Sequence, residues 1–423
     1  MERKRMSGWH LSAGLSVVLG LVLLLGVQVA SVLAQAKPLR IGLGMALTGG
    51  LAANGKAALL AMQIWAEDVN AQGGLLGRQV ELVYYDDQTK PATVPAIYTK
   101  LLDVDKVDFV VSGYGTNLVA PAMPIVMERG MVFMGLFALA ANEKFNYPYY
   151  FGIAPIGPNP RTDSSKGFFE LARRQQLQTV ALVGADAEFA RNSLSGAREN
   201  AKTYGLKVVY DTTYPPATTD FSPIVRAIKA TNPEVVFVAS YPPDSVGMTL
   251  AAHEVGLEPK LLGGGMVGLQ FAAFLSKLGP KLNGIVNYDF WVPEPTLNFP
   301  GVNDFLKKYQ AKAEAAGVDP LGHYLPPWAY ANMQVLEQAI TATKSTDQKT
   351  VGEYIRKNSF DTIIGKVTFA PNGEWATSRM LMVQYQNING NELEQFYGPG
   401  KRVILYPQEW KSGELIFPYA KAK

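Results

Sequence analysis

The sequence predicts an α/β fold built from two doubly wound parallel sheets. Short apolar runs, typical of buried parallel strands, alternate with amphipathic helical segments about every 20 to 30 residues. This rhythm stops at residues 147–160, YPYYFGIAPIGPNP, which contain four prolines, and then restarts in a similar layout. Residues 291–300 hold three further prolines. We therefore expect two similar halves, with proline-rich segments where the chain crosses between them.

In the first half, strands and helices are expected to alternate. The strands are expected at residues 39–46, 79–85, 108–112 and 131–134, and the helices at 56–70, 93–102 and from 116 or 117 onward. Short β-branched and aromatic runs predict the strands, and apolar residues that share one face predict the helices.

The second half repeats this alternation. Helices are expected at residues 166–175, 189–204, 220–228, 244–255 and 269–278, and strands at 179–183, 206–210, 234–239, 260–262 and 284–288. After the second proline-rich segment, helices at 302–315, 328–343 and 351–358 are expected to pack back on the first sheet, followed by a β-rich tail over 360–397.

Residues 1–36 predict a signal peptide. Arg3, Lys4 and Arg5 form a basic start, residues 11–33 are mostly apolar, and residues 32–36 offer two small-residue cleavage sites, ending at Ala34 or Ala36. The apolar run is long enough to span a bilayer, so an uncleaved anchor is the alternative. No cysteine follows this run, which excludes a lipid anchor on a cysteine.

Composition excludes several functional classes. The net charge is +3 over 423 residues, and +2 of it falls in residues 1–36. Residues 37–423 therefore lack the excess of basic residues that is typical of nucleic-acid-binding proteins. The chain has no cysteine and only three histidines, which are far apart, so we expect no zinc or other metal site. The common catalytic motifs for serine hydrolysis, metalloproteolysis and paired-carboxylate chemistry do not occur. We therefore expect neither an enzyme nor a cofactor.

The stretch DFVVSGYGTNLVAPAM, residues 108–123, has the pattern of a strand, a glycine-rich turn and a helix capped by Thr116 or Asn117. Such a turn presents free backbone N–H groups at the carboxyl end of the sheet, where small anions and other ligands bind in open α/β folds. Taken alone, the stretch favours an ordinary strand-to-helix turn with a good cap.

Three further motifs are weak. Residues 50–57 resemble a phosphate-binding loop, but Ala57 stands where a Ser or Thr is needed, so a flexible turn or a ligand-facing turn is expected. Residues 263–268 fit G-x-G-x-x-G after a late strand, which predicts another turn facing the cleft. Asp86 and Asp87 are expected to form a solvated strand end, with an acid pair as the alternative.

Several aromatic side chains fall near strand ends or crossings. They are Tyr114, Phe137, Phe189, Tyr241 and Trp291. Each one alone is more typical of the core or the surface than of a ligand contact, but their shared placement raises the odds of a ligand site.

Five segments, in order, resemble the leucine/isoleucine/valine-type periplasmic binding proteins of ABC importers. They are residues 41–55, IGLGMALTGGLAANG, then 68–89, 111–126, 221–238 and 360–373. The resemblance implies a type I periplasmic binding protein fold, with two lobes joined by a three-crossing hinge that close over a small-molecule ligand.

On this resemblance, lobe 1 comprises residues 37–152 and 292–378, and lobe 2 comprises residues 153–291 and 379–423. The implied protein is a periplasmic monomer that delivers its ligand to a membrane permease. A membrane-anchored sensor of the same fold is the alternative.

The resemblance also implies site residues. Thr116 stands where the family places a hydroxyl on the ligand carboxylate, and the backbone at Phe137 contacts the same group. Tyr241 matches a second-lobe tyrosine, Phe189 replaces another aromatic residue, and Asn54 stands where an aromatic often covers the ligand. The full expected set is Asn54, Tyr114, Gly115, Thr116, Phe137, Ala138, Leu139, Phe189, Tyr241, Gly265 and Met266.

Two departures from the family pattern alter the expected ligand. Leu139 replaces a Thr that holds the carboxylate, and Gly265 replaces the Glu that pairs with the ligand's ammonium. A buried ammonium without a counter-ion costs several kcal/mol, unless Asp186 or Glu188 takes the role. We therefore expect a roomier pocket and a ligand with one polar or anionic end and an apolar or aromatic body.

Overall fold

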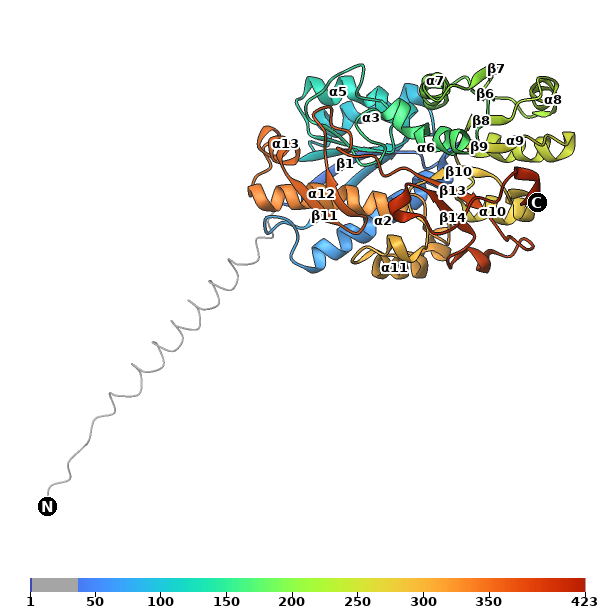
Figure 1. Ribbon diagram of the computed structural model, residues 1–423. Helices are drawn as coiled ribbons and strands as arrows, with labels where there is room; N and C mark the ends of the chain where they lie inside the picture. Colours follow the sequence, from blue (N-terminus) through green and yellow to red (C-terminus); the bar gives the residue numbers. More distant parts are fainter. Residues whose placement is uncertain (2–36, 423) are drawn as a thin grey trace.

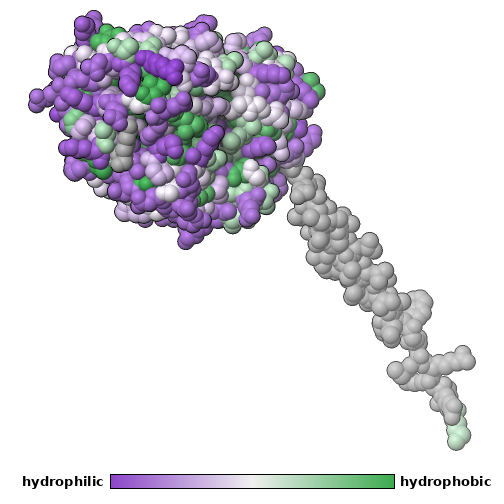
Figure 2. Space-filling view, turned by 90° about the vertical axis from the view of Figure 1, so that its right-hand side faces the viewer, coloured by the Kyte–Doolittle hydropathy of each residue, from purple (hydrophilic) through white to green (hydrophobic). Residues whose placement is uncertain are grey.

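The computed structural model describes Met1 and residues 37–422, so the predicted signal peptide lies, apart from Met1, outside the described residues. Two sheets form the framework, and helices cover the faces of both (Figure 1). Within the described residues, no helix is both long and apolar enough to cross a bilayer. Figure 2 shows a largely hydrophilic face with apolar side chains visible in a recess.

The first sheet has five parallel strands in the order β2-β1-β3-β4-β5. Its strands are β1 Leu39–Met45, β2 Val80–Asp86, β3 Phe109–Tyr114, β4 Phe133–Leu136 and β5 Tyr150–Gly152. The helices between them are α2 Ala52–Ala71, α3 Val94–Thr99, α4 Thr116–Val119 and α5 Met123–Glu128. Strand β5 lies in the segment that was expected only to cross between halves.

The second sheet has seven strands in the order β14-β13-β10-β9-β8-β6-β7. Five are mutually parallel: β6 Thr179–Ala185, β7 Lys207–Tyr214, β8 Val235–Ser240, β9 Leu261–Met266 and β10 Val286–Asp289. The antiparallel edge is formed by β13 Leu381–Tyr385 and β14 Arg402–Tyr406. Its helices are α6 Pro160–Arg174, α7 Glu188–Thr203, α8 Ser222–Ala230, α9 Pro242–Val255 and α10 Ala272–Leu278. Both sheets confirm the predicted α/β class, and the antiparallel edge is an addition to it.

The chain passes between the two sheets three times: after β5, after β10 and before β13. Between the second and third passages lie α11 Val302–Ala316, α12 Pro326–Thr343, α13 Gln348–Lys357 and the hairpin of β11 Ser359–Thr362 and β12 Gly365–Thr368. The indole of Trp65 in α2 donates to Glu337 in α12 at 2.7 Å, and Tyr330 of α12 donates to Asp68 of α2 at 2.9 Å. As expected, these helices pack back on the first sheet.

Two glycine-containing motifs form the expected turns only at one end, at residues 50–51 and 267–268. Residues 263–265 lie inside strand β9, where Gly263 and Gly264 have φ values of +141° and +110°. A Cβ on Gly263 would lie 1.8 Å from the carbonyl oxygen of Val286, so glycine allows the neighbouring strand to approach. Residues 52–57 are the first turns of α2, and a Cβ on Gly55 would lie 2.0 Å from the Ala46 oxygen. In both motifs the glycines permit close tertiary packing, a role that local turn rules do not predict.

The strand end at Asp86 and Asp87 is less solvated than expected. Asp86 accepts hydrogen bonds from the backbone N–H groups of Leu47 and Thr48, which fixes the loop after β1. Asp87 is buried, and burial raises its pKa to about 6, although the N–H of Thr89 donates to its carboxylate. The prediction of a solvated strand end is therefore wrong for Asp87.

Candidate functional site: a cavity between the two sheets

A cavity of about 660 Å³, including its mouth, lies where strand ends of the two sheets face each other. Its walls are formed by Leu51, Tyr114, Gly115, Thr116, Asn117, Phe137, Leu139, Ile156, Ser164, Phe189, Ser193, Tyr241, Gly265, Val267, Tyr288, Phe290, Tyr324 and Met380. Both sheets and all three crossings contribute residues, so the site exists only in the assembled fold.

The turn after β3 forms one wall of the cavity. Gly115, with φ of +94°, is the N-cap of α4, and no side chain caps that helix, so the predicted cap at Thr116 or Asn117 is wrong. The Thr116 hydroxyl instead accepts a hydrogen bond from the Leu139 N–H at 2.8 Å. This bond ties the turn after β3 to the loop after β4.

Asn117 connects the two halves across the mouth of the cavity. Its side-chain oxygen accepts from the Tyr241 hydroxyl at 3.0 Å and from the Phe189 N–H at 3.3 Å. Next to this contact, the Asn192 side chain donates to the Leu139 carbonyl at 3.0 Å. These hydrogen bonds hold the two halves in a closed arrangement.

Aromatic rings form the inner end of the cavity. The Phe137 ring lies 4.4 Å from Phe290 and 5.5 Å from Tyr324, measured between centroids. The Tyr324 hydroxyl lies 3.4 Å from that of Tyr114 and 3.2 Å from that of Tyr288. The cavity is therefore apolar around a small cluster of hydroxyl groups.

None of the lining side chains carries a formal charge at neutral pH. Burial raises the pKa of Tyr114 to about 12, so its phenol stays neutral. Asp186 and Glu188, the alternative partners for an ammonium group, do not line the cavity, and Asp186 forms an exposed ion pair with Arg191. In residues 37–422, no three His, Cys, Asp or Glu side chains are grouped to hold a metal ion.

Eight of the eleven expected site residues line the cavity: Tyr114, Gly115, Thr116, Phe137, Leu139, Phe189, Tyr241 and Gly265. Asn54 does not, because it lies in α2 and is buried beside Tyr114. Ala138 is buried outside the lining, and Met266 faces a separate small apolar space below α9. Trp291 also lies outside the lining, and its indole donates to the Leu297 carbonyl at 3.0 Å.

Ten lining residues were not expected. They are Leu51, Asn117, Ile156, Ser164, Ser193, Val267, Tyr288, Phe290, Tyr324 and Met380. Tyr288 and Phe290 lie at the carboxyl end of β10, so the same placement rule that drew attention to Trp291 could have found them. Tyr324 and Met380 precede α12 and β13, where no strand-end rule applies.

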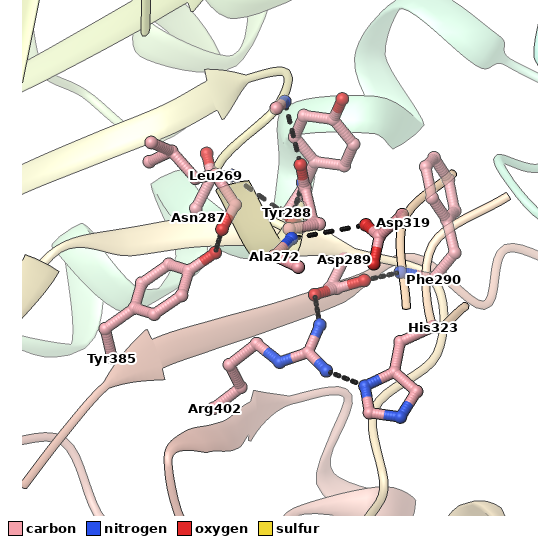
Figure 3. A network of polar contacts seen from close by, with 12 residues as sticks. Leu269, Ala272, Asn287, Tyr288, Asp289, Phe290, Asp319, His323, Tyr385 and Arg402 are labelled. Carbon is pink, nitrogen blue, oxygen red and sulfur yellow. Dashed lines mark hydrogen bonds and ion pairs between the residues drawn. The ribbon is translucent and has the colours of Figure 1, made fainter. Parts of the chain in front are cut away.

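A buried polar network supports the inner end of the cavity (Figure 3). Arg402 of β14 donates to Asp289 at 3.1 Å and to Nδ1 of His323 at 2.7 Å, and Asp289 accepts from the Phe290 N–H at 2.8 Å. Burial and the charge of Arg402 lower the pKa of His323 well below its usual value, so His323 is a neutral acceptor. Since Tyr288, Phe290 and Tyr324 adjoin these residues in the chain, the network fixes the segments that carry them.

Comparisons with known proteins agree with this architecture. Residues 38–391 match the family model described as "Periplasmic binding protein". A leucine-, isoleucine-, valine-, threonine- and alanine-binding protein from Pseudomonas aeruginosa is 24% identical over 82% of this chain and 89% of its own length. A Leu/Ile/Val-binding protein from Escherichia coli is 23% identical over 81% of this chain and 89% of its own length.

Two solved structures share the fold. A leucine-binding protein from Thermotoga maritima superposes with a TM-score of 0.72 at 19% identity, covering 82% of this chain and 96% of that one. A solute-binding protein of an ABC transporter from Rhodopseudomonas palustris, in complex with p-hydroxybenzoic acid, gives a TM-score of 0.73 at 19% identity, covering 88% and 99%. With more than half of its length matched by the family model, and with this fold, the chain belongs to the periplasmic binding protein family.

Proposed function

We propose that this protein captures one small ligand between two lobes and delivers it to the permease of an ABC importer. The ligand has an apolar or aromatic body and one polar or anionic end, and it requires no ammonium contact. One observation carries the proposal: the closed cavity is lined from both sheets by aromatic, aliphatic and uncharged polar side chains. Ligand that contacts both lobes stabilises the closed state over the open one.

The lobes in this proposal are residues 37–152 with 292–378, and residues 153–291 with 379–423. The signal peptide is removed near Ala34 or Ala36, and the exported protein acts as a periplasmic monomer. The eight expected residues that line the cavity are the proposed ligand contacts, together with Asn117, Tyr288, Phe290 and Tyr324.

The relatives suggest two ligand classes, branched aliphatic amino acids and aromatic carboxylates. An amino acid would bring a buried ammonium group into a cavity that presents no carboxylate. Because an unpaired buried charge costs several kcal/mol, this cavity favours the second class. The rings of Phe137, Phe290 and Tyr324 also favour a flat ligand body.

A thermal-shift screen of residues 37–423 tests the proposal. The panel holds leucine, valine, aromatic and aliphatic carboxylates, and small amides. A ligand at 100 times its dissociation constant adds about 2.7 kcal/mol to the free energy of unfolding, which raises the melting temperature by a few degrees. We expect shifts with compounds that lack an amino group. A shift with leucine or valine alone would contradict the proposed ligand class.

A further inference from the structure

We propose that the hydroxyls of Tyr114, Tyr288 and Tyr324 form the polar subsite of the cavity and donate a hydrogen bond to a carboxylate or carbonyl oxygen on the ligand. This inference rests on the proposed function and names the group that recognises the ligand's polar end. It differs from the expectation from the resemblance, which places that end at the turn around Thr116.

The three tyrosines come from separate parts of the fold. Tyr114 ends β3 of the first sheet, Tyr288 lies in β10 of the second sheet, and Tyr324 lies just before α12. The central hydroxyl, that of Tyr324, is 3.4 Å from Tyr114 and 3.2 Å from Tyr288. All three side chains are buried and line the same cavity. A ligand that reaches this cluster therefore contacts both sheets at one point.

A count of protons shows what the cluster offers. Each hydroxyl has one proton to donate, and the two hydrogen bonds within the cluster use two of the three. Whichever way the bonds run, one O–H is not used within the cluster, and where it is that of Tyr114 the amide of Asn54 lies beside it. A buried donor without an acceptor costs about 1–3 kcal/mol. A ligand oxygen placed at this O–H removes that cost, so the cluster selects for an acceptor.

The charge of the surroundings also favours an acceptor over a cation. No carboxylate lines the cavity, so a ligand ammonium would find only neutral groups there. Burial raises the pKa of Tyr114 to about 12, so its hydroxyl keeps its proton across the physiological range. A hydrogen bond from a neutral hydroxyl to an anionic oxygen is stronger than one to a neutral acceptor.

The neighbouring rings limit the shape of the group that carries this oxygen. Phe290 lies 5.3 Å from Tyr288 and 5.8 Å from Tyr324, and Phe137 lies 5.5 Å from Tyr324. Side chains of this kind pack best against the face or edge of another flat ring. The inferred ligand is therefore an aromatic ring that bears a carboxylate or carbonyl group.

The competing position, at the turn after β3, already has some of its hydrogen bonds made within the protein. The Leu139 N–H donates to the Thr116 hydroxyl, and the side-chain oxygen of Asn117 receives the Tyr241 hydroxyl and the Phe189 N–H. A ligand carboxylate at this turn would have to compete with or rearrange these bonds. At the tyrosine cluster it gains a donor that has no other acceptor within the cluster.

Isothermal titration of the exported protein with benzoate, benzamide, toluene, benzylamine and leucine tests the inference. The first four probes share one ring and differ in the group it bears: a hydrogen-bond acceptor, no polar group, or a cation. The variant is the triple substitution Tyr114→Phe, Tyr288→Phe and Tyr324→Phe, because each single substitution still leaves the cluster with an O–H that is free to donate. Tyr98→Phe is the matched control, because the Tyr98 hydroxyl is buried but donates to the Val111 carbonyl outside the cavity.

We expect the wild-type protein to bind benzoate and benzamide more tightly than toluene, and benzylamine most weakly. In the triple variant, benzoate affinity should fall about 10-fold or more while toluene affinity stays unchanged. A merely structural role would weaken all probes alike. Tyr98→Phe should keep the full preference for benzoate.

Unchanged benzoate affinity in the triple tyrosine variant, with a large loss in Thr116→Val, would overturn the inference and leave the proposed function standing. Tightest binding of leucine, unaffected by the tyrosine substitutions, would overturn both the inference and the proposed ligand class. If neither leucine nor any of the ring compounds binds the wild-type protein, the proposed function fails and the inference fails with it.

Discussion

Glu374 is expected to make the stability of this protein fall as the pH rises. It lies in the third crossing, is almost completely buried, and neither carboxylate oxygen has a hydrogen-bond partner. Burial, with a smaller contribution from the charge of Glu143, raises its pKa to about 8. The folded protein therefore holds a proton on Glu374 at pH values where the unfolded chain has lost it.

The size of the effect follows from the difference between the two pKa values. The unfolded value is about 4.5, so the stability from this proton is complete below pH 4.5 and is lost as the pH rises to about 8. Each pH unit in this window costs about 1.4 kcal/mol, so the free energy of unfolding falls by roughly 5 kcal/mol in total. Asp87 and Asp244 act in the same direction, but only up to about pH 6. Between pH 6 and 8 we assign most of the loss, roughly 3 kcal/mol, to Glu374.

Urea denaturation at pH 5, 6, 7 and 8 measures this slope. Glu374→Gln should remove most of the decline between pH 6 and 8, because an amide does not ionise. Glu353→Gln, at an exposed ion pair on α13, is the matched control and should keep the wild-type slope. A Glu374→Gln protein whose stability declines as steeply as the wild type would refute the reasoning.

Three further predictions concern the closed cavity and its support. Asn117→Ala removes the acceptor shared by Tyr241 and Phe189, so ligand dissociation should become about 10-fold faster in stopped-flow measurements, while an unchanged rate would count against a bridging role. Tyr241→Ala should weaken binding at least about 10-fold with little change in circular dichroism, and retained affinity would place the ligand elsewhere. Arg402→Met leaves Asp289 buried without its partner and should cost about 3–5 kcal/mol in urea denaturation; adding Asp289→Asn should restore part of this loss, and no loss at all would contradict the pairing.

The sequence predicted the fold well because its signals are local. The apolar strand segments around Phe109 and Thr179 can be recognised from neighbouring residues alone, and so can the proline-rich crossings. The glycines at 263–265 were misread because their role is to let Val286 and Phe237 approach, which depends on residues distant in the sequence or on other strands. A local rule assigns glycine to a turn whether or not another strand lies against it.

The site was predicted in part for the same reason. Tyr114 and Phe137 follow strands directly, so a rule about strand ends finds them. Tyr324 lies between α11 and α12 and is held at the cavity by the network around Arg402, which lies 78 residues later in the chain. Asn54 was expected only from its position in the family pattern, and in the structure it lies inside α2 and is buried.

The antiparallel edge of the second sheet affects how the protein folds during synthesis. Strands β13 and β14 come from residues 381–406, and β13 pairs with β10 more than 90 residues earlier. In the first half, helix α2 is covered by α12, which is also synthesised late. At about 5–20 residues per second, the ribosome needs roughly 20–80 s to supply these segments. Neither half can complete its core until most of the chain has been made, so the growing polypeptide should remain unfolded, and open to translocation, throughout that time.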